Sequence, residues 1–384
     1  MAHALLSPSS ASRWIACTPS ARFEQQFPDS TSVFAEEGTL AHSLGELLIR
    51  NKLGEIKKAS YKKLLEQIKS NELYEEAMFE YCDEYATFVM ERFAEAQTRS
   101  KHAQIHLEIK LDLTKWVPNG YGTSDVIIVA DDFMETIDLK YGKGVPVSVE
   151  ENKQQMLYAL GAIEAYEFLF DIHTVRMTVF QPRISNTASW ETNITGLKLW
   201  AEDELITRAN MAHNGEGEFV PGPHCGFCKG KAVCKALASF NLQLAKHEFA
   251  DPNKLSDDDI SDIMQKTKMF VNWIDAVNDY ALDQAINHGK KWPGYKVVEG
   301  RSNRKYTDAE KIAEILLSKG FNADTIYNKK LLSITDMESE LGKKIFTDLV
   351  GEYVIKPQGK PTLAPSTDKR PEINSLEKAQ KEFL

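Results

Sequence analysis

The sequence has few cysteines, a negative net charge and no long apolar run, and each of these features excludes a class of protein. Five cysteines, an odd number in 384 residues, do not suggest a disulfide framework. The longest strand-like apolar run, Val126 to Ala130, is far shorter than the roughly 18 residues that span a bilayer, so we expect no integral membrane protein. The net charge of −10 argues against a uniformly basic nucleic-acid binder. The N-terminus lacks a basic start followed by a long apolar stretch, which predicts a cytosolic protein.

The rest of the composition is that of a folded chain. Hydrophobic residues make up 42% and charged residues 27% of the sequence, close to the globular average. At this length we expect one large domain with an appendage, or two domains. The apolar periodicity predicts several helices, then three consecutive strands, a helix and a further strand, which is an α/β pattern. Helices are expected at 11–17, 38–50, 151–170 and 195–211, with one or two more within 61–99, and the strands are expected at 104–111, 122–130, 133–140 and 173–180.

The C-terminal third differs in character. A helical pattern covers 255–287, and a smaller module follows, with a strand-like piece at 295–298 and helical patterns at 308–317 and 336–350. Several closely spaced prolines then indicate an extended, mobile tail. We therefore expect a first domain at 1–250, a long connecting helix at 251–290, a small module at 291–355 and a Pro-rich tail at 356–384.

The most informative stretch runs from Asp125 to Lys140. Side chains two residues apart on a strand share a face, so Asp138 and Lys140 project together. Asp125 begins the adjacent strand of the predicted hairpin, close enough for its carboxylate to meet that of Asp138. Two buried carboxylates repel each other, and Mg²⁺ is a natural compensating ion that can also take phosphate oxygens. Lys140 could then orient or deprotonate a water, or stabilise charge on a phosphate. The alternative is a turn aspartate beside an ordinary Asp–Lys ion pair.

An Asp followed 13 residues later by D-x-K on a hairpin, with a helix before and a helix and strand after, resembles the catalytic core of the PD-(D/E)XK nuclease superfamily. The resemblance implies a mixed central sheet flanked by helices, as in restriction endonucleases, with Asp125, Asp138 and Lys140 as catalytic residues. One difference is Ser124, which stands where the superfamily's name has proline. The whole chain also resembles a phage- and prophage-encoded family of this superfamily, through the phrases DLKYGKG, VEGRSNRKY and KPTLAPSTDKRP.

Two of the expected helices carry further residues that resemble the RecB-like exonuclease branch. His42 and Glu46 lie four residues apart on one helical face, and so do Gln154 and Tyr158. The resemblance implies that His42 is an additional ligand of Mg²⁺ or Mn²⁺, and that Gln154 and Tyr158 contact DNA near the active site. Glu46 is a possible additional acid. Taken alone, these would be a structural histidine, a solvated glutamine and a packed tyrosine.

The cysteines give an independent signal. Cys225, Cys228 and Cys234 follow one another in C-x2-C-x5-C spacing, and Cys17 lies far upstream. Four thiolates can hold zinc or an iron–sulfur cluster. The pattern resembles the 4Fe-4S clasp of AddB-type helicase–nuclease subunits and CRISPR-associated RecB-like exonucleases, which implies a cluster at these four positions, with zinc or free thiols as alternatives. Cys82 lies outside the pattern and is expected to be a small buried hydrophobe.

A local basic patch supports a nucleic-acid partner. Six Lys and Arg side chains against one Glu lie within 286–306, and aromatic residues are interleaved with them. Basic groups can neutralise phosphates while aromatic rings stack on bases, so we expect Arg301, Arg304 and Lys305 to contact DNA. A solvated face over an aromatic core is the alternative. Lys143, between two glycines beside the proposed site, is a further phosphate contact.

Together these residues predict a divalent-metal-dependent DNA nuclease, an exonuclease by the resemblance, that acts in phage recombination or DNA processing in the bacterial cytosol. DNA is the expected partner, a phage recombinase or single-strand annealing protein is a further candidate, and a homo-oligomer is compatible with the sequence. Two alternatives stay open. One is a nuclease-derived DNA-binding scaffold that no longer cuts, and the other is a structural zinc protein.

Overall fold

The computed structural model describes residues 4–28, 33–143, 146–242, 256–298, 309–319, 322–327 and 332–354. Arg301, Arg304, Lys305 and the predicted tail at 356–384 lie outside these residues, so their expected roles stay predictions. The proposed division into domains stays a prediction as well. Within the described ranges, no helix is both long and apolar enough to cross a membrane.

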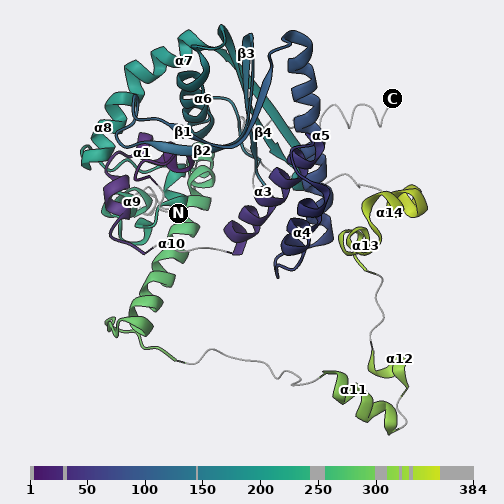
Figure 1. Ribbon diagram of the computed structural model, residues 1–384. Helices are drawn as coiled ribbons and strands as arrows, with labels where there is room; N and C mark the ends of the chain where they lie inside the picture. Colours follow the sequence, from purple (N-terminus) through teal and green to yellow (C-terminus); the bar gives the residue numbers. More distant parts are fainter. Residues whose placement is uncertain are drawn as a thin grey trace, which may run out of the picture.

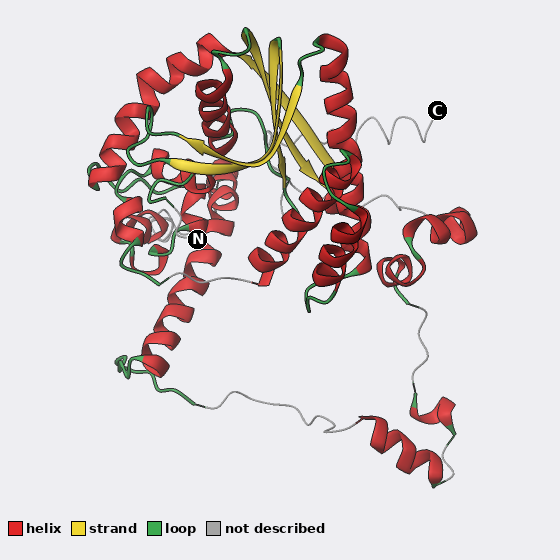
Figure 2. Cartoon of the chain, in the orientation of Figure 1, coloured by secondary structure: helices red, strands yellow, loops and turns green. Residues whose placement is uncertain are grey.

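A five-stranded mixed sheet forms the centre of the molecule (Figures 1 and 2). Its strands, in spatial as in chain order, are β1 (Gln104–Asp112), β2 (Tyr121–Ala130), β3 (Asp132–Leu139), β4 (Ile172–Gln181) and β5 (Asn186–Asn193). All neighbours are antiparallel except β3 and β4, which are parallel because the helix α6 (Lys153–Tyr166) connects them across one face. The α/β class, the mixed sheet and the order of three strands, helix and strand are confirmed.

Helices cover both faces of the sheet because its central strands are apolar on both sides. On β2, Val126 and Ile128 join one hydrophobic cluster while Ile127 and Val129 join the other. The first cluster is covered by α3 (Val33–Lys52), α4 (Lys58–Lys69) and α5 (Glu76–Arg99). The second is covered by α6 together with α1 (Ala11–Ala16), α7 (Ile194–Trp200) and α8 (Ile206–Asn214). A strand that is buried on both faces has a continuous run of apolar residues in the sequence.

Several short elements complete the body. They are η1 (Pro8–Ser10), α2 (Ser20–Glu24), η2 (Pro182–Ile184), the π-helical turn η3 (Ala201–Leu205), η4 (Pro223–Phe227), η5 (Lys231–Val233) and α9 (Lys235–Leu242). The long helix α10 (Asp257–Asn287) packs against η4, η5 and α9. The C-terminal helices are α11 (Ala309–Ser318), α12 (Ala323–Ile326), α13 (Ile334–Leu341) and α14 (Lys343–Val350), followed by η7 (Gly351–Tyr353).

Three sequence expectations need correction. The strand-like piece at 295–298 is not a strand, and these residues are exposed. The helix expected over 336–350 is divided at Gly342, whose φ of +80° is a left-handed conformation that ends α13. The edge strand β5 was not expected, because Asn186–Asn193 is mostly polar and half-exposed.

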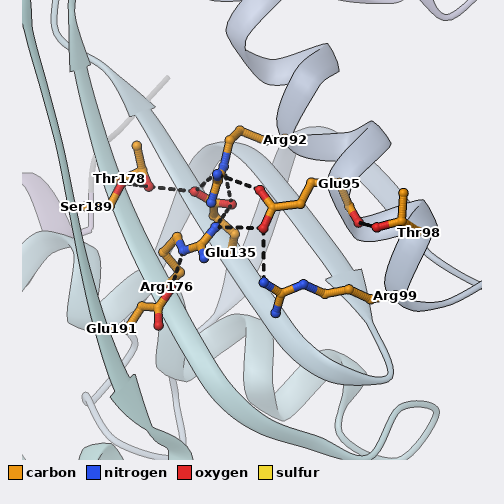
Figure 3. Close-up of polar contacts among 9 residues, drawn as sticks. All are labelled: Arg92, Glu95, Thr98, Arg99, Glu135, Arg176, Thr178, Ser189 and Glu191. Carbon is orange, nitrogen blue, oxygen red and sulfur yellow. Dashed lines mark hydrogen bonds and ion pairs between the residues drawn. The ribbon is translucent and has the colours of Figure 1, made fainter.

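A buried polar network fixes α5 to the sheet (Figure 3). Glu135 of β3 is 1% exposed, and its carboxylate accepts hydrogen bonds from Nε of Arg92 at 3.0 Å and from Oγ1 of Thr178 at 2.6 Å. Arg176 lies 3.5 Å from the same carboxylate and also pairs with Glu191 at 2.5 Å. The network thus joins α5, β3, β4 and β5 through one buried carboxylate.

Glu135→Ala should therefore lower the free energy of unfolding by about 3 kcal/mol, because it leaves Arg92 and Arg176 without their buried counter-charge. Glu135→Gln should cost less, since an amide oxygen can still accept from Thr178. Glu191→Ala is the matched control, because Glu191 is half-exposed and its loss should cost no more than about 1 kcal/mol. Urea titration followed by circular dichroism measures all three, and equal losses for Glu135→Ala and Glu191→Ala would contradict the assigned importance of Glu135.

Candidate metal and nucleic-acid site

The two predicted aspartates meet just beyond the point where the pairing of β2 with β3 begins, near the C-terminal end of β3. The register pairs Val126 with Ile137, so Asp125 and Asp138 are the next opposed positions. The backbone N–H of Leu139 donates to Oδ2 of Asp125 at 2.8 Å, which holds that carboxylate against β3. Asp138 is buried at 3% exposure. Its burial raises the pKa of the Asp138 carboxyl, an effect that the nearby Lys140 ammonium opposes and the Asp125 charge reinforces.

Lys140 and Gln154 are both held by Asp138. Nζ of Lys140 lies 2.9 Å from Oδ2 of Asp138, and Nε2 of Gln154 donates to Oδ1 at 3.1 Å. The amide oxygen of Gln154 accepts from Nζ of Lys140 at 3.2 Å, and its amide nitrogen also donates to the Tyr158 hydroxyl at 3.3 Å. Asn152 caps α6 by accepting from the backbone N–H of Gln154, which fixes the start of this helix beside the site. The expected pair on one face of α6 thus lies directly beside the D-x-K residues.

His42 comes from α3 and reaches the same end of the sheet. Its Nδ1 lies 3.2 Å from Oδ2 of Asp125. Burial alone would lower the pKa of His42, but the charge of Asp125 and the hydrogen bond to it, reinforced by Asp138, raise it to about 9. In the absence of a metal, the imidazole is therefore a cation at neutral pH that compensates the two carboxylates.

Glu108 is a further residue of the site, one that the sequence pattern did not indicate. Ligand atoms of His42, Glu108 and Asp125 all lie within 4.8 Å of one another. The neighbouring pairs Leu107 with Val126 and Ile109 with Ser124 place Glu108 opposite Asp125, and its φ of +49° interrupts the regular ladder there. Burial, reinforced by the Asp125 charge, raises the pKa of Glu108 to about 7. Glu108 is the one acidic residue within the strand expected at 104–111, and this isolated acid is the sequence feature that could have indicated it as a site residue.

Two other predicted residues lie near this group without joining it. The carboxylate of Glu46 accepts a hydrogen bond from Arg50 at 2.8 Å, on the next turn of α3. Lys143 is exposed on the segment that follows β3. Tyr141, between Lys140 and that segment, is buried, and the Arg183 guanidinium lies 4.6 Å from its ring centre. The exposed Lys143 therefore extends from a firmly anchored strand end.

The four cysteines of the predicted set line one pocket. Cys17 follows α1, Cys225 lies in η4, and Cys228 and Cys234 flank η5, with Arg13, His224 and Lys231 also in the lining. The backbone N–H of Gly222 donates to Sγ of Cys225 at 3.4 Å. In the described part of the chain, their sulfurs do not form a set of three or more ligand atoms within 4.8 Å of one another. Cys82 lies elsewhere, buried against α3, where its thiol donates to the Ala41 carbonyl at 3.4 Å.

The cysteine loop is tied to the N-terminal segment by a buried glutamate. Glu24 of α2 accepts from Nε of Arg13 at 2.7 Å and from the backbone N–H of Lys229 at 2.8 Å. Burial raises the pKa of the Cys228 thiol to about 12, with the Glu24 charge contributing. The buried Cys228 thiol is therefore protonated at neutral pH in the metal-free protein.

Comparison with known proteins gives a family match over nearly the whole chain. The sequence model described as "Protein of unknown function (DUF2800)" matches residues 3–371. A solved structure titled "Crystal structure of SSO0001" is 12% identical to this chain, with a TM-score of 0.22. The match covers 59% of this chain and 96% of that one.

Proposed function

We propose that this chain, which belongs to the DUF2800 family, is a divalent-metal-dependent deoxyribonuclease of the PD-(D/E)XK type. The observation that carries the proposal is the convergence of His42, Glu108 and Asp125 beside the Asp138–Lys140 pair at one end of the sheet. A structural ion pair needs neither a third carboxylate nor an imidazole. By its resemblance to RecB-like exonucleases, we propose that it degrades DNA from ends, in phage recombination or DNA processing.

The residues present fit a hard divalent cation. The close group offers two carboxylates and one imidazole, and Asp138 adds a third carboxylate nearby. Mg²⁺ and Mn²⁺ prefer such oxygen-rich sites, and Mn²⁺ accepts an imidazole as well. The ion, when bound, would activate water and neutralise charge on the scissile phosphate. His42, Glu108, Asp125 and Asp138 are the proposed ligands.

Lys140 and Gln154 have distinct proposed roles. Burial would lower the pKa of Lys140, but the adjacent Asp138 carboxylate outweighs that effect and raises it. Lys140 is therefore a cation in the free protein, suited to stabilise charge on the phosphate oxygens. Gln154 bonds to both Asp138 and Lys140, so it orients them, and Tyr158 and Lys143 are proposed to contact the DNA backbone.

The test is incubation of the full chain with end-labelled linear and closed circular DNA, single- and double-stranded, in Mg²⁺, Mn²⁺ or EDTA. Cleavage that requires a divalent ion and a free end is expected. Cutting of closed circles would replace the exonuclease assignment by an endonuclease. Absence of cleavage on every substrate with both metals would favour the non-cleaving DNA-binding scaffold.

Metal binding should release protons, because two of the proposed ligands hold protons in the free protein. The pKa of His42 is raised to about 9 and that of Glu108 to about 7, so at pH 7 the first is largely protonated and the second about half. Affinity for Mn²⁺ should thus strengthen as pH rises from 6 to 9. Calorimetry in buffers of different ionisation enthalpy measures the release. His42→Ala should bind Mn²⁺ more weakly and release fewer protons, and unchanged release would leave His42 outside the ligand set.

We propose that Cys17, Cys225, Cys228 and Cys234 hold a 4Fe-4S cluster. What supports it is their shared pocket, in which Cys82 takes no part. Four thiolates are the ligands that such a cluster requires. When bound, the cluster would supply a structural cross-link rather than chemistry at the phosphate. Zinc is the alternative occupant, with the same thiolates.

A further inference from the structure

The long helix α10 has one face that packs on the body and one that does not. Its 31 residues span about 46 Å at ~1.5 Å per residue. Phe270, Trp273 and Val277 are half-buried on the inner side, and the helix contacts η4, η5 and α9. In Figure 1 the C-terminal half of α10 extends away from the sheet. Among the described residues, the outer face of the helix is exposed from Ile260 to Asn278, and Ala281 and Ala285 near its C-terminal end are half-buried.

The outer face carries a regular seam. Its large apolar members, Ile260, Met264, Val271 and Ile274, are 38% to 48% exposed. With their neighbours they alternate in spacings of four and three residues, which is the seam of a coiled coil rather than the wider stripe of a helix packed on a domain. The eight positions are Ile260, Met264, Thr267, Val271, Ile274, Asn278, Ala281 and Ala285.

The order of sizes along the seam selects an antiparallel partner with the same sequence. Bulky residues stand at the N-terminal end and alanines at the C-terminal end. Reversing a second copy about the midpoint places Ile260 opposite Ala285, Met264 opposite Ala281, Thr267 opposite Asn278 and Val271 opposite Ile274. Every layer then matches large with small, polar with polar, or two β-branched side chains. A parallel copy would instead pair like with like, overfilling one end and leaving the other hollow.

Charges beside the seam agree with this arrangement. Lys268 and Asp275 are exposed and follow two seam positions, Thr267 and Ile274. The two are seven positions apart in one chain, too far for an intrahelical pair. In the antiparallel arrangement each Lys268 faces Asp275 of the second copy, so the pair occurs twice. At the alanine end, both alanines are half-buried and the Trp292 indole donates to the Ala281 carbonyl at 2.8 Å.

We propose that two copies of this chain form a symmetric dimer through antiparallel pairing of α10. A two-fold axis passes between Val271 and Ile274, and the same surface is used on both copies. The dimer carries two nuclease bodies at opposite ends of the paired helices. It depends on the seam alone, so it stands or falls independently of the cleavage activity.

The first test is the mass of the full chain by size-exclusion chromatography with light scattering. We expect twice the 43.3 kDa of one chain at micromolar concentration. Val271→Glu places two charges beside the axis and should raise the dissociation constant by about 100-fold or more. Asn272→Glu, exposed on the same turn but outside the seam, is the matched control and should stay dimeric. A single-chain mass for the unmodified protein, or an unchanged dimer in Val271→Glu, would overturn the proposal.

Orientation is tested by charge reversal and cross-linking. Lys268→Glu should weaken the dimer, and adding Asp275→Lys should restore it. In an oxidised mixture of Met264→Cys and Ala281→Cys chains, disulfide-linked dimers should join one chain of each kind, with the unmodified protein as the background for native cysteines. Efficient cross-linking of Met264→Cys chains with each other would show a parallel pair and overturn the antiparallel arrangement.

Discussion

Asp138→Asn is expected to reduce metal-dependent DNA cleavage by about 10³-fold or more while leaving the fold intact. Asp138 is buried between the Lys140 ammonium and the Gln154 amide, and the substitution removes the charge that holds Lys140 protonated at the site. An Asn side chain has the same shape, so Gln154 and the strand pairing should persist. Single-turnover cleavage of linear DNA in Mg²⁺ measures the loss, and thermal unfolding checks the fold.

Asp132→Asn provides the matched control for this loss. Asp132 begins the same strand, but its side chain is 78% exposed at the other end of β3 and pairs with His173. Cleavage by this variant should equal that of the unmodified protein. Lys140→Met separates the two roles at the site, since it should lose turnover while still binding Mn²⁺. Full activity in Asp138→Asn would remove the D-x-K residues from the mechanism.

Cys228→Ser is expected to abolish the colour of the purified protein and to lower its thermal stability. Anaerobically prepared protein should contain about four irons per chain and absorb broadly near 400 nm, as 4Fe-4S proteins do. Cys228 shares its pocket with Cys17, Cys225 and Cys234, so losing one thiolate should remove the whole cluster and the link between the N-terminal segment and the loop.

Cys82→Ala is the control for the cysteine experiment. Cys82 is fully buried in the hydrophobic cluster beneath α3 and α5, away from the pocket of the four cysteines. Its replacement should therefore leave iron content and absorbance unchanged. Bleaching in this variant would contradict the assignment of the four ligands. One tightly held zinc in a colourless protein would replace the cluster by a structural zinc site and would leave the proposed hydrolytic site unaffected.

The parts of the fold that could be predicted are those with strong apolar periodicity. The β2 strand is a continuous apolar run, because both its faces are buried, and it was found with nearly correct bounds. β5 could not be found in the same way. It is an edge strand whose alternate residues face solvent, and Ala188 and Trp190 alone give little apolar signal.

The proposed site shows the same division. The proximity of Asp125, Asp138 and Lys140 could be predicted because all three lie on one hairpin, whose register is fixed by its turn. Glu108 depends on the register of a second strand pair and on a left-handed residue within it, and neither can be read from the sequence pattern. The approach of Cys17 to the cysteine loop was expected from a resemblance, since spacing alone says nothing about contacts between distant segments.

The pocket that Cys17 shares with Cys225 also determines the order in which the chain can fold during synthesis. At about 5–20 residues per second, the ribosome needs roughly 10–40 s to make the residues between these two cysteines. Helix α1, with Trp14 and Ile15, packs on α6 and α8, so its apolar side has no native surface to cover it until those helices emerge. Contacts this distant in sequence form late. The N-terminal segment therefore stays without its native partners until α8 has been made.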